Sequence, residues 1–317
     1  MVYIAASCTQ ELDMPFPQGK EQLVLNSILH PDSTIKISLT KTLPLGSTGT
    51  DFPVVDNAEI RLYEDEVLVG MPAYQDSIYI LDYLPKAGKE YRIEVDVPGY
   101  TMLQANDRIP KPPVVSACVK PDKQYKYYGA SIDISLEDDK SVNNVYWFNI
   151  DYDFINYFSC ERNDGGPIKT EACRKAENGT EVYYKSYSSL PDRFNAFIDN
   201  TSNGASQYDF FIRISDQTLE EEQINFNIAS NMTGLSTSLD FEIYNYLNII
   251  SASRHYDRFL KSSVIYAQNR ADYDDDDGGF RPFSETTQTY SNVENGTGIF
   301  AAYNSVTIPL IDYPCEQ

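Results

Sequence analysis

Short runs in which apolar and polar residues alternate cover much of the first third of the chain. In EYRIEVDV (90–97), charged residues occupy one face and the other face carries Tyr91, Ile93, Val95 and Val97. This period of two is typical of a half-buried β-strand. Further strand-like runs lie at 23–29, 34–40, 58–64, 66–70 and 77–84. Turns rich in Gly, Pro, Asp and Asn separate them and no helical run intervenes, so residues 21–109 predict a β-sandwich.

The stretch RIPKPPVV (108–115) predicts the boundary between two domains. Its prolines, Pro110, Pro112 and Pro113, hold the backbone extended and exclude a helix or a central strand. We therefore expect the first domain to end near residue 109 and a larger, mainly β domain to cover residues 114–317. The expected strands of this second domain lie at 127–138, 143–153, 181–190, 208–215, 224–229, 237–246 and 298–310.

One segment of the second domain has a helical period instead. From about residue 249 to residue 270 the sequence has a helical stripe, formed by Ile249, Ala252, Tyr256, Phe259, Ser263 and Ala267. Ser251 or Ser253 is suited to cap the start, because a Ser side chain accepts a hydrogen bond from a free N–H of the first turn. We expect a single amphipathic helix, laid on a sheet.

Composition narrows the class of protein. The chain has 317 residues, 42% of them hydrophobic, with 25 Tyr and 15 Phe against one Trp, and such aromatic residues favour pleated, half-buried surfaces. The net charge of −22 repels a nucleic-acid backbone and an anionic lipid surface, so we expect no nucleic-acid partner. No run approaches the ~20 apolar residues that a membrane helix needs.

Five cysteines bear on the cellular compartment. Cys8 stands apart near the start, behind small residues and ahead of the acidic Glu11 and Asp13. The simplest pairing of the other four is Cys160 with Cys173 and Cys118 with Cys315, which implies an oxidising compartment. The alternative is four unrelated buried thiols.

We expect the first residues of the chain to attach the protein to a membrane. We interpret residues 1–7 as the remnant of a signal peptide that starts upstream of this numbering, and Cys8 as the acylated first residue of the mature protein. Residues 8–20 are polar, contain proline and predict a flexible tether.

An aspartate run is the candidate metal site. Asp272, Asp274 and Asp276 have the spacing of the first three ligands of a calcium loop. The sixth position holds Asp277 where such a loop needs Gly, so an EF-hand is excluded. An irregular Ca²⁺ site is one interpretation, and a solvated acidic loop is the other.

The sequence contains little that indicates an enzyme. No nucleophile elbow or phosphate-binding loop occurs. His255 lies on the expected helix, where its neighbours in sequence do not face it, so we interpret it as an exposed surface histidine. We therefore expect no enzymatic activity and no cofactor besides the candidate Ca²⁺.

The last third of the chain resembles a known family. HYDRFLKS, RPFSE and TYSNVENGTGIFAAYNS (289–305) resemble the closing signature of Bacteroidota outer-membrane lipoproteins grouped as domain of unknown function 4249. The matching signature residues are Tyr290, Asn292, Glu294, Asn295, Gly296, Gly298 and Phe300. The segments VDNAEIRLYED and KAGKEYRIEVDVPGYTMLQANDRIP resemble the transthyretin-like, immunoglobulin-like sandwich that opens these proteins. The resemblance covers nearly the whole chain.

The resemblance implies a lipid anchor on Cys8 and a place on the cell surface at the outer membrane. Family members are typically encoded beside TonB-dependent transporters of the SusC type, which implies a β-barrel partner. Asp-Ser-Thr at 32–34 and Asp-Ser-Ile at 76–78 resemble the O-glycosylation motif of that phylum, so Ser33 and Ser77 are candidate glycosylation sites.

Two functions follow, and the sequence names no cargo for either. The first is an accessory subunit of an outer-membrane transporter or a related complex. The alternative is a free-standing surface lipoprotein for ligand binding or adhesion, for instance to glycans through exposed Tyr and Trp147. Trp147 lies in the apolar run YWFNI, however, which is more typical of a core.

Overall fold

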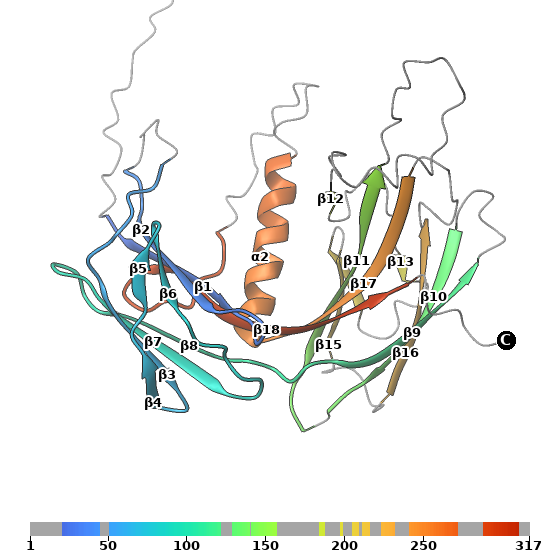
Figure 1. The fold of residues 1–317 in the computed structure, drawn as a ribbon, viewed down its shortest axis with the longest axis horizontal. Helices are drawn as coiled ribbons and strands as arrows, with labels where there is room; N and C mark the ends of the chain where they lie inside the picture. The colour runs from blue at the N-terminus through green and yellow to red at the C-terminus, as the bar shows by residue number, and fades with distance from the viewer. Residues whose placement is uncertain are drawn as a thin grey trace, which may run out of the picture.

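The structure is a computed structural model. It describes residues 21–44, 51–121, 129–139, 141–156, 184–187, 197–198, 205–208, 211–215, 223–231, 241–271 and 288–310. These residues form a mainly β protein with two sandwiches and the helix α2, which stands between them (Figure 1). The fold class expected from the sequence is confirmed.

The N-terminal sandwich packs two sheets face to face. One sheet has the order β4-β3-β7-β8, formed by β3 (Glu59–Glu64), β4 (Val67–Gly70), β7 (Glu90–Asp96) and β8 (Leu103–Arg108). The other contains β1 (Leu23–Leu29), β2 (Ile35–Lys41), β5 (Ala73–Gln75) and β6 (Ile78–Leu81). Strands β4 and β5 are the edge strands of their sheets and follow each other in the chain, so both edges lie at one side of the sandwich.

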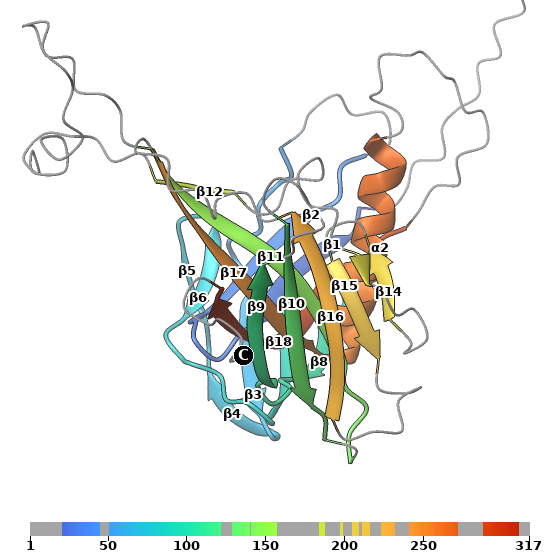
Figure 2. The ribbon, with the colours of Figure 1, turned by 90° about the vertical axis from the view of Figure 1, so that its right-hand side faces the viewer.

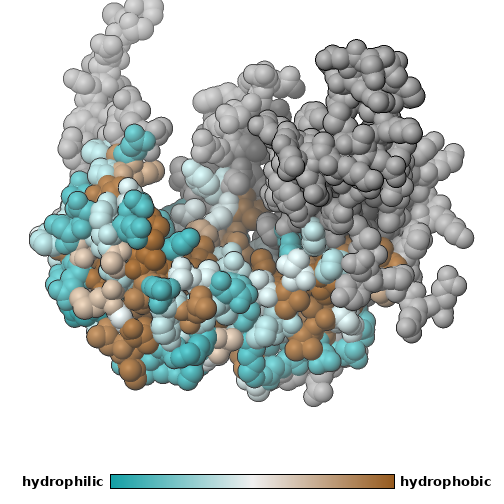
Figure 3. Space-filling view, viewed as in Figure 1, coloured by the Kyte–Doolittle hydropathy of each residue, from teal (hydrophilic) through white to brown (hydrophobic). Residues whose placement is uncertain are grey.

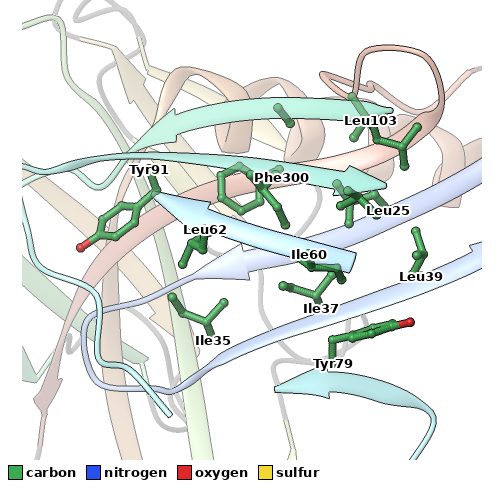
Figure 4. Close-up of a cluster of buried hydrophobic side chains, with 14 of the residues drawn as sticks. Leu25, Ile35, Ile37, Leu39, Ile60, Leu62, Tyr79, Tyr91, Leu103 and Phe300 are labelled. Carbon is green, nitrogen blue, oxygen red and sulfur yellow. The ribbon is translucent and has the colours of Figure 1, made fainter. Parts of the chain in front are cut away.

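The core between these sheets follows the alternation in the sequence. Buried and half-buried residues alternate along β7, and Tyr91, Ile93 and Val95 are fully buried as predicted. They pack with residues of the opposite sheet (Figure 4), among them Leu25, Ile37 and Phe300. Every second side chain of these strands therefore stabilises the sandwich by removing apolar surface from water.

The C-terminal sandwich has the same two-sheet plan (Figure 2). One sheet contains β9 (Val114–Pro121), β10 (Gly129–Glu137), β13 (Phe197–Ile198) and β16 (Gln223–Asn231). The other contains β11 (Val145–Asn156), β12 (Tyr184–Tyr187), β14 (Ala205–Tyr208), β15 (Phe211–Ser215) and β17 (Phe241–Ala252).

A single strand, β18 (Thr297–Pro309), belongs to both sandwiches. Its first half runs parallel to β1, with Leu29 opposite Ala302 at the end of the pairing. Its second half runs antiparallel to β17, beginning with Ala252 opposite Tyr303. The result is a ten-stranded sheet that continues from one sandwich into the other. The expected division at residues 109 and 114 therefore needs a correction, because residues 297–302 complete the first sandwich.

The helix α2 (Arg254–Ala271) begins later than the sequence pattern predicts. Ile249 and Ala252, assigned to the helical stripe, instead lie on β17, where β11 and β18 pair on both sides and bury them. The helical period in the sequence placed the start of α2 too early. Apolar residues at the end of β17 happen to continue the three- and four-residue spacing of the apolar face of α2. Of the two expected caps, Ser253 fills the role, since its Oγ accepts a hydrogen bond of 3.0 Å from the N–H of Tyr256. In the part of the chain that the structure describes, no helix has the length and apolar character needed to cross a membrane.

The close approach of β18 to β1 depends on Gly298. This residue has φ +113°, and a Cβ atom placed on it lies 2.1 Å from the carbonyl oxygen of Leu25. Gly99 also has a positive φ, +88°, but a Cβ there meets nothing within 4 Å.

We predict that Gly298→Ala lowers the free energy of unfolding by more than about 4 kcal/mol or prevents folding, because the added methyl group displaces β1. Gly99→Ala, the matched control, costs only about 1 kcal/mol from backbone strain. Urea unfolding of both variants measures the difference, and equal losses in the two contradict the close-approach argument.

Candidate functional site

The site lies where β18 passes from one sandwich to the other. At Ala302 the N–H donates a hydrogen bond of 2.8 Å to Asp107 Oδ2 on β8. The carbonyl of Ala302 accepts one of 3.1 Å from the N–H of Ser253, at the start of α2. The Ser253 hydroxyl also donates to Asp107 Oδ2. One carboxylate thus connects β8, β18 and the cap of α2, and we call this group the junction lock.

Asp107 is an inward-facing charged residue. It is 6% exposed, and its Oδ1 accepts a hydrogen bond of 2.9 Å from the N–H of Arg108. Burial raises the pKa of Asp107 to about 7, although its hydrogen bonds with Ser253, Arg108 and Ala302 act in the opposite direction. Near neutral pH the junction therefore holds a carboxyl group that changes its charge.

A cavity of about 550 Å³ opens beside the junction lock. Its walls come from the proline-rich linker at 108–114, the turn and strand ends at 137–146, and the segment 251–254. Asp138, 8% exposed, is among the lining residues. Its Oδ1 accepts hydrogen bonds of 3.0 Å from Asn144 Nδ2 and of 3.0 Å from the hydroxyl of Tyr146. Both sandwiches thus contribute a buried carboxylate to one cavity.

The cationic side chains of the linker are held at the surface. Lys111 Nζ lies 3.0 Å from Asp139 Oδ2 and the Lys111 side chain is 74% exposed. Hydrogen bonds from Ser141 and Lys111 lower the pKa of Asp139 to about 2. Arg108 lies 2.9 Å from Glu90 and its side chain is 60% exposed. Both cations are exposed and paired, so among the described lining residues the buried charged groups are the carboxyl groups of Asp107 and Asp138.

Several of the signature residues lie in the segment just before β18 and hold it in place. Asn292 acts as a clamp, because its Oδ1 accepts from the N–H of Phe300 at 3.0 Å and its Nδ2 donates to the carbonyl of Phe300 at 2.7 Å. Asn295, with φ 61°, donates to the carbonyl of Met102 at 2.9 Å. The N–H of Glu294 donates to the carbonyl of Gln104 at 2.8 Å. These contacts tie the segment before β18 to β8 and the loop before it.

The remaining signature residues are also structural. Gly296 leaves room for Leu103 and the Leu23 carbonyl, and Phe300 is fully buried in the first core. The Tyr290 hydroxyl lies 2.7 Å from His255 Nδ1, and the two rings stack at 5.9 Å. His255 is half-buried, so its interpretation as an exposed surface histidine is wrong. Burial and the nearby Arg258 and Arg254 lower the pKa of His255.

A serine, a histidine and an aspartate meet near the end of β1. Ser305 Oγ lies 3.1 Å from His30 Nε2, and Asp32 Oδ2 lies 4.0 Å from His30 Nδ1. The backbone N–H of Asp32 donates to His30 Nδ1 at 3.2 Å, which assigns the proton of a neutral ring to Nε2. Nε2 then donates to Ser305, whereas a general base must accept the hydroxyl proton. The trio fastens a turn to β18 and does not activate Ser305.

The single Trp belongs to a buried polar group. Trp147 is fully buried and its indole N–H donates to Asp257 Oδ1 at 3.0 Å. Arg213 forms two further hydrogen bonds with Asp257, of 2.6 and 3.0 Å. The expectation that Trp147 is a core residue is confirmed, and Trp147 offers no platform for stacking a sugar.

Several predicted site residues lie outside the described residues. Among these are Cys8, Cys160, Cys173 and Cys315, and also Asp272, Asp274 and Asp276. Cys118 lies half-buried on β9 and is disulfide-bonded. The other four cysteines lie outside the described residues, so its partner and both cysteine pairings stay predictions. Ser33 and Ser77 lie in exposed turns after β1 and β5. Within the described ranges, no three His, Cys, Asp or Glu residues gather as a metal site.

The sequence reading missed Asp107, although a signal was present. In β8 the buried positions alternate, and Leu103, Ala105 and Asp107 share the inward face. A charged residue on an apolar face is the informative exception to the burial pattern. The other carboxylate of the cavity, Asp138, follows β10 and has no comparable pattern in the sequence.

Comparison with known families gives one match. The model of a family described as a domain of unknown function (DUF4249) matches residues 9–308. No curated protein matches the sequence.

The raised pKa of Asp107 gives a stability prediction. A carboxyl group whose pKa is higher in the folded protein than in the unfolded chain binds more protons when folded, so folding loses stability as pH rises from about 4 to about 7. The loss from Asp107 is at most roughly 4 kcal/mol.

We predict that Asp107→Asn removes this loss, because the amide oxygen still serves Ala302 and Ser253 while the group no longer ionises. Urea unfolding between pH 4.5 and pH 8.5 measures the slope. Asp96→Asn, an exposed aspartate on the neighbouring β7, is the control that keeps the parental slope. An Asp107→Asn protein with an unchanged slope contradicts the assignment.

Proposed function

Because the chain belongs to the DUF4249 family over residues 9–308, we propose that it is a lipid-anchored cell-surface subunit of an outer-membrane complex. In this proposal the partner is a TonB-dependent transporter barrel of the SusC type. Cys8 carries the lipid, residues 9–20 are the tether, and the pairs Cys160–Cys173 and Cys118–Cys315 are disulfides of an oxidising compartment.

The observation that supports a partner most directly is an exposed apolar edge. Val67 is 67% exposed, Leu68 50%, Met71 52% and Tyr74 42%. We call these four residues the edge patch. They follow one another from β4 to β5, the edge strands of the two sheets. Apolar side chains are exposed at this end of the molecule, at the lower left of the space-filling view (Figure 3). Exposed apolar residues on an edge strand favour an interaction surface.

The architecture supports a presenting role for the first sandwich. β18 and the junction lock join the sandwiches through one continuous sheet, so the edge patch has a fixed position relative to the second sandwich. β4 and β5 are also short, with four and three residues, which limits self-association through the edges. A docking edge on a rigid body is what a structural subunit of a membrane complex requires.

The alternative of a free-standing glycan-binding module receives less support. Its single indole, Trp147, is buried and engaged with Asp257. An exposed ring is needed for stacking against a sugar face.

We predict that the native chain co-purifies with a β-barrel after gentle detergent extraction of the membranes. Replacing Val67 and Leu68 together by Lys lowers the recovered barrel at least tenfold, because full burial of a Val or Leu side chain contributes about 1.5–3 kcal/mol and a buried Lys loses it. Tyr266→Lys on α2, where the side chain is 46% exposed, is the matched control and leaves recovery unchanged. A monodisperse chain without a barrel in native extracts sinks the proposal.

The anchor has its own test. We expect Cys8→Ser to release the chain from the membrane fraction, since stable membrane attachment requires the acyl chains. Mass spectrometry of the N-terminal peptide from native cells shows an acylated Cys8 at the first position. An unmodified peptide that still contains residues 1–8 contradicts the anchor.

A further inference from the structure

The cavity beside the junction lock has the size and the walls of a small-molecule site. Its volume of about 550 Å³ lies in the range of typical ligand pockets. Apolar walls come from Ile109, Pro110 and Pro112 of the linker and from Val142 of the facing turn. Because the walls come from both sandwiches and the junction lock fixes their positions, the cavity is preformed.

The buried charge in this cavity is negative. Asp107 enters from the first sandwich and Asp138 from the second, and both are less than a tenth exposed. Arg108 and Lys111 are directed outward to Glu90 and Asp139, and Arg254 at the start of α2 is exposed. A ligand that enters therefore meets apolar surface and two buried carboxyl groups, and among the described lining residues an anion finds no buried cation.

We propose that this cavity binds a small organic cation, an amine carried on an apolar body, with its ammonium group held by Asp107 and Asp138. The apolar body packs against Pro110, Pro112 and Val142. Asp107 accepts three hydrogen bonds from described residues, through Arg108, Ser253 and Ala302, and a carboxylate has about four acceptor sites. One site thus remains for the ammonium group. This inference goes beyond the proposed function and does not depend on a membrane partner.

Protonation of Asp107 competes with such a ligand. The buried carboxyl group is partly neutral near pH 7 because burial, and to a smaller extent the nearby Glu90, raises the pKa of Asp107. The charged groups around it are Glu90 of β7, Arg108, Lys111 of the linker, Glu137, Asp138 and Asp139 of the facing turn, and Arg254 of α2. An ammonium ion takes the place of the proton, so binding becomes tighter as Asp107 ionises.

The test uses three probes with the same apolar body and different head charge. These are 2-phenylethylamine, the neutral 2-phenylethanol and the anionic 3-phenylpropionate, measured by calorimetry and thermal shift on the purified full chain. We expect binding of the amine alone, about tenfold tighter at pH 8 than at pH 6, because the ionised fraction of Asp107 rises about tenfold between them. Binding of the anion, equal binding of all three probes, or binding of none overturns the proposal.

Matched variants locate the ligand. Asp138→Asn weakens amine binding at least tenfold, and Asp107→Asn removes its pH dependence. Val142 is 52% exposed at the rim, so Val142→Lys and Val142→Glu leave the core intact, remove the same apolar contact and differ only in the charge that they place at the mouth. We expect the Lys variant to bind the amine at least tenfold more weakly than the Glu variant, because only their head charges differ in sign. Glu59→Gln on β3, away from the cavity, changes nothing. Amine binding that is insensitive to both Val142 variants places the ligand elsewhere and overturns the proposal.

These measurements need no barrel and no lipid anchor. Loss of barrel co-purification with intact amine binding rejects the proposed function alone. Absence of amine binding in a chain that still retains its barrel rejects the cavity inference alone.

Discussion

The fold depends on the passage of one strand between two sheets without leaving its backbone unpaired. Buried N–H and C=O groups must find partners, and β18 exchanges β1 for β17 between Ala302 and Tyr303. At Ala302 the missing partners come from Asp107 and Ser253. Because Ser253 also caps α2, the same few atoms fix the start of the helix and pair the backbone of β18 where it exchanges β1 for β17. This arrangement buries the carboxyl group of Asp107, which is unfavourable when the group is ionised. The raised pKa of Asp107 is the result of that burial.

The signature residues acquire a physical meaning from this passage. Gly298 allows β18 to approach β1, where any side chain collides with the Leu25 carbonyl. Asn292 supplies both a donor and an acceptor to Phe300, as a neighbouring strand does elsewhere. The residues that resemble the closing signature of the family therefore specify the junction, and they act mainly inside the molecule. Function must be sought in the surfaces that the junction positions, namely the edge patch and the cavity between the sandwiches.

Sequence patterns predicted those parts of the fold that depend on local alternation. The alternation in EYRIEVDV correctly predicted which residues of β7 face the core, and the apolar run YWFNI correctly predicted that Trp147 is buried. The start of α2 was placed several residues early because Ile249 and Ala252 are apolar for a different reason, namely burial in the central strand β17. Local sequence patterns could not predict that β18 pairs with both β1 and β17. The pairing with β1 joins segments that lie more than 250 residues apart in the chain. The candidate site could not be predicted for the same reason, because Asp107 and Asp138 share a cavity only after both sandwiches have packed.

The junction also explains why a ligand in the cavity affects the whole body. The sandwiches are joined by β18, by the junction lock and by the proline-rich linker, and the cavity lies next to all of these connections. A cation held by Asp107 and Asp138 adds a contact between the first sandwich and the second. It also lowers the cost of an ionised Asp107, on which Ala302 and Ser253 depend. A ligand that interacts more favourably with the joined arrangement shifts the population toward it by that difference in free energy. In the proposed complex, an occupied cavity then stabilises the one position of the edge patch relative to the second sandwich that the junction lock sets.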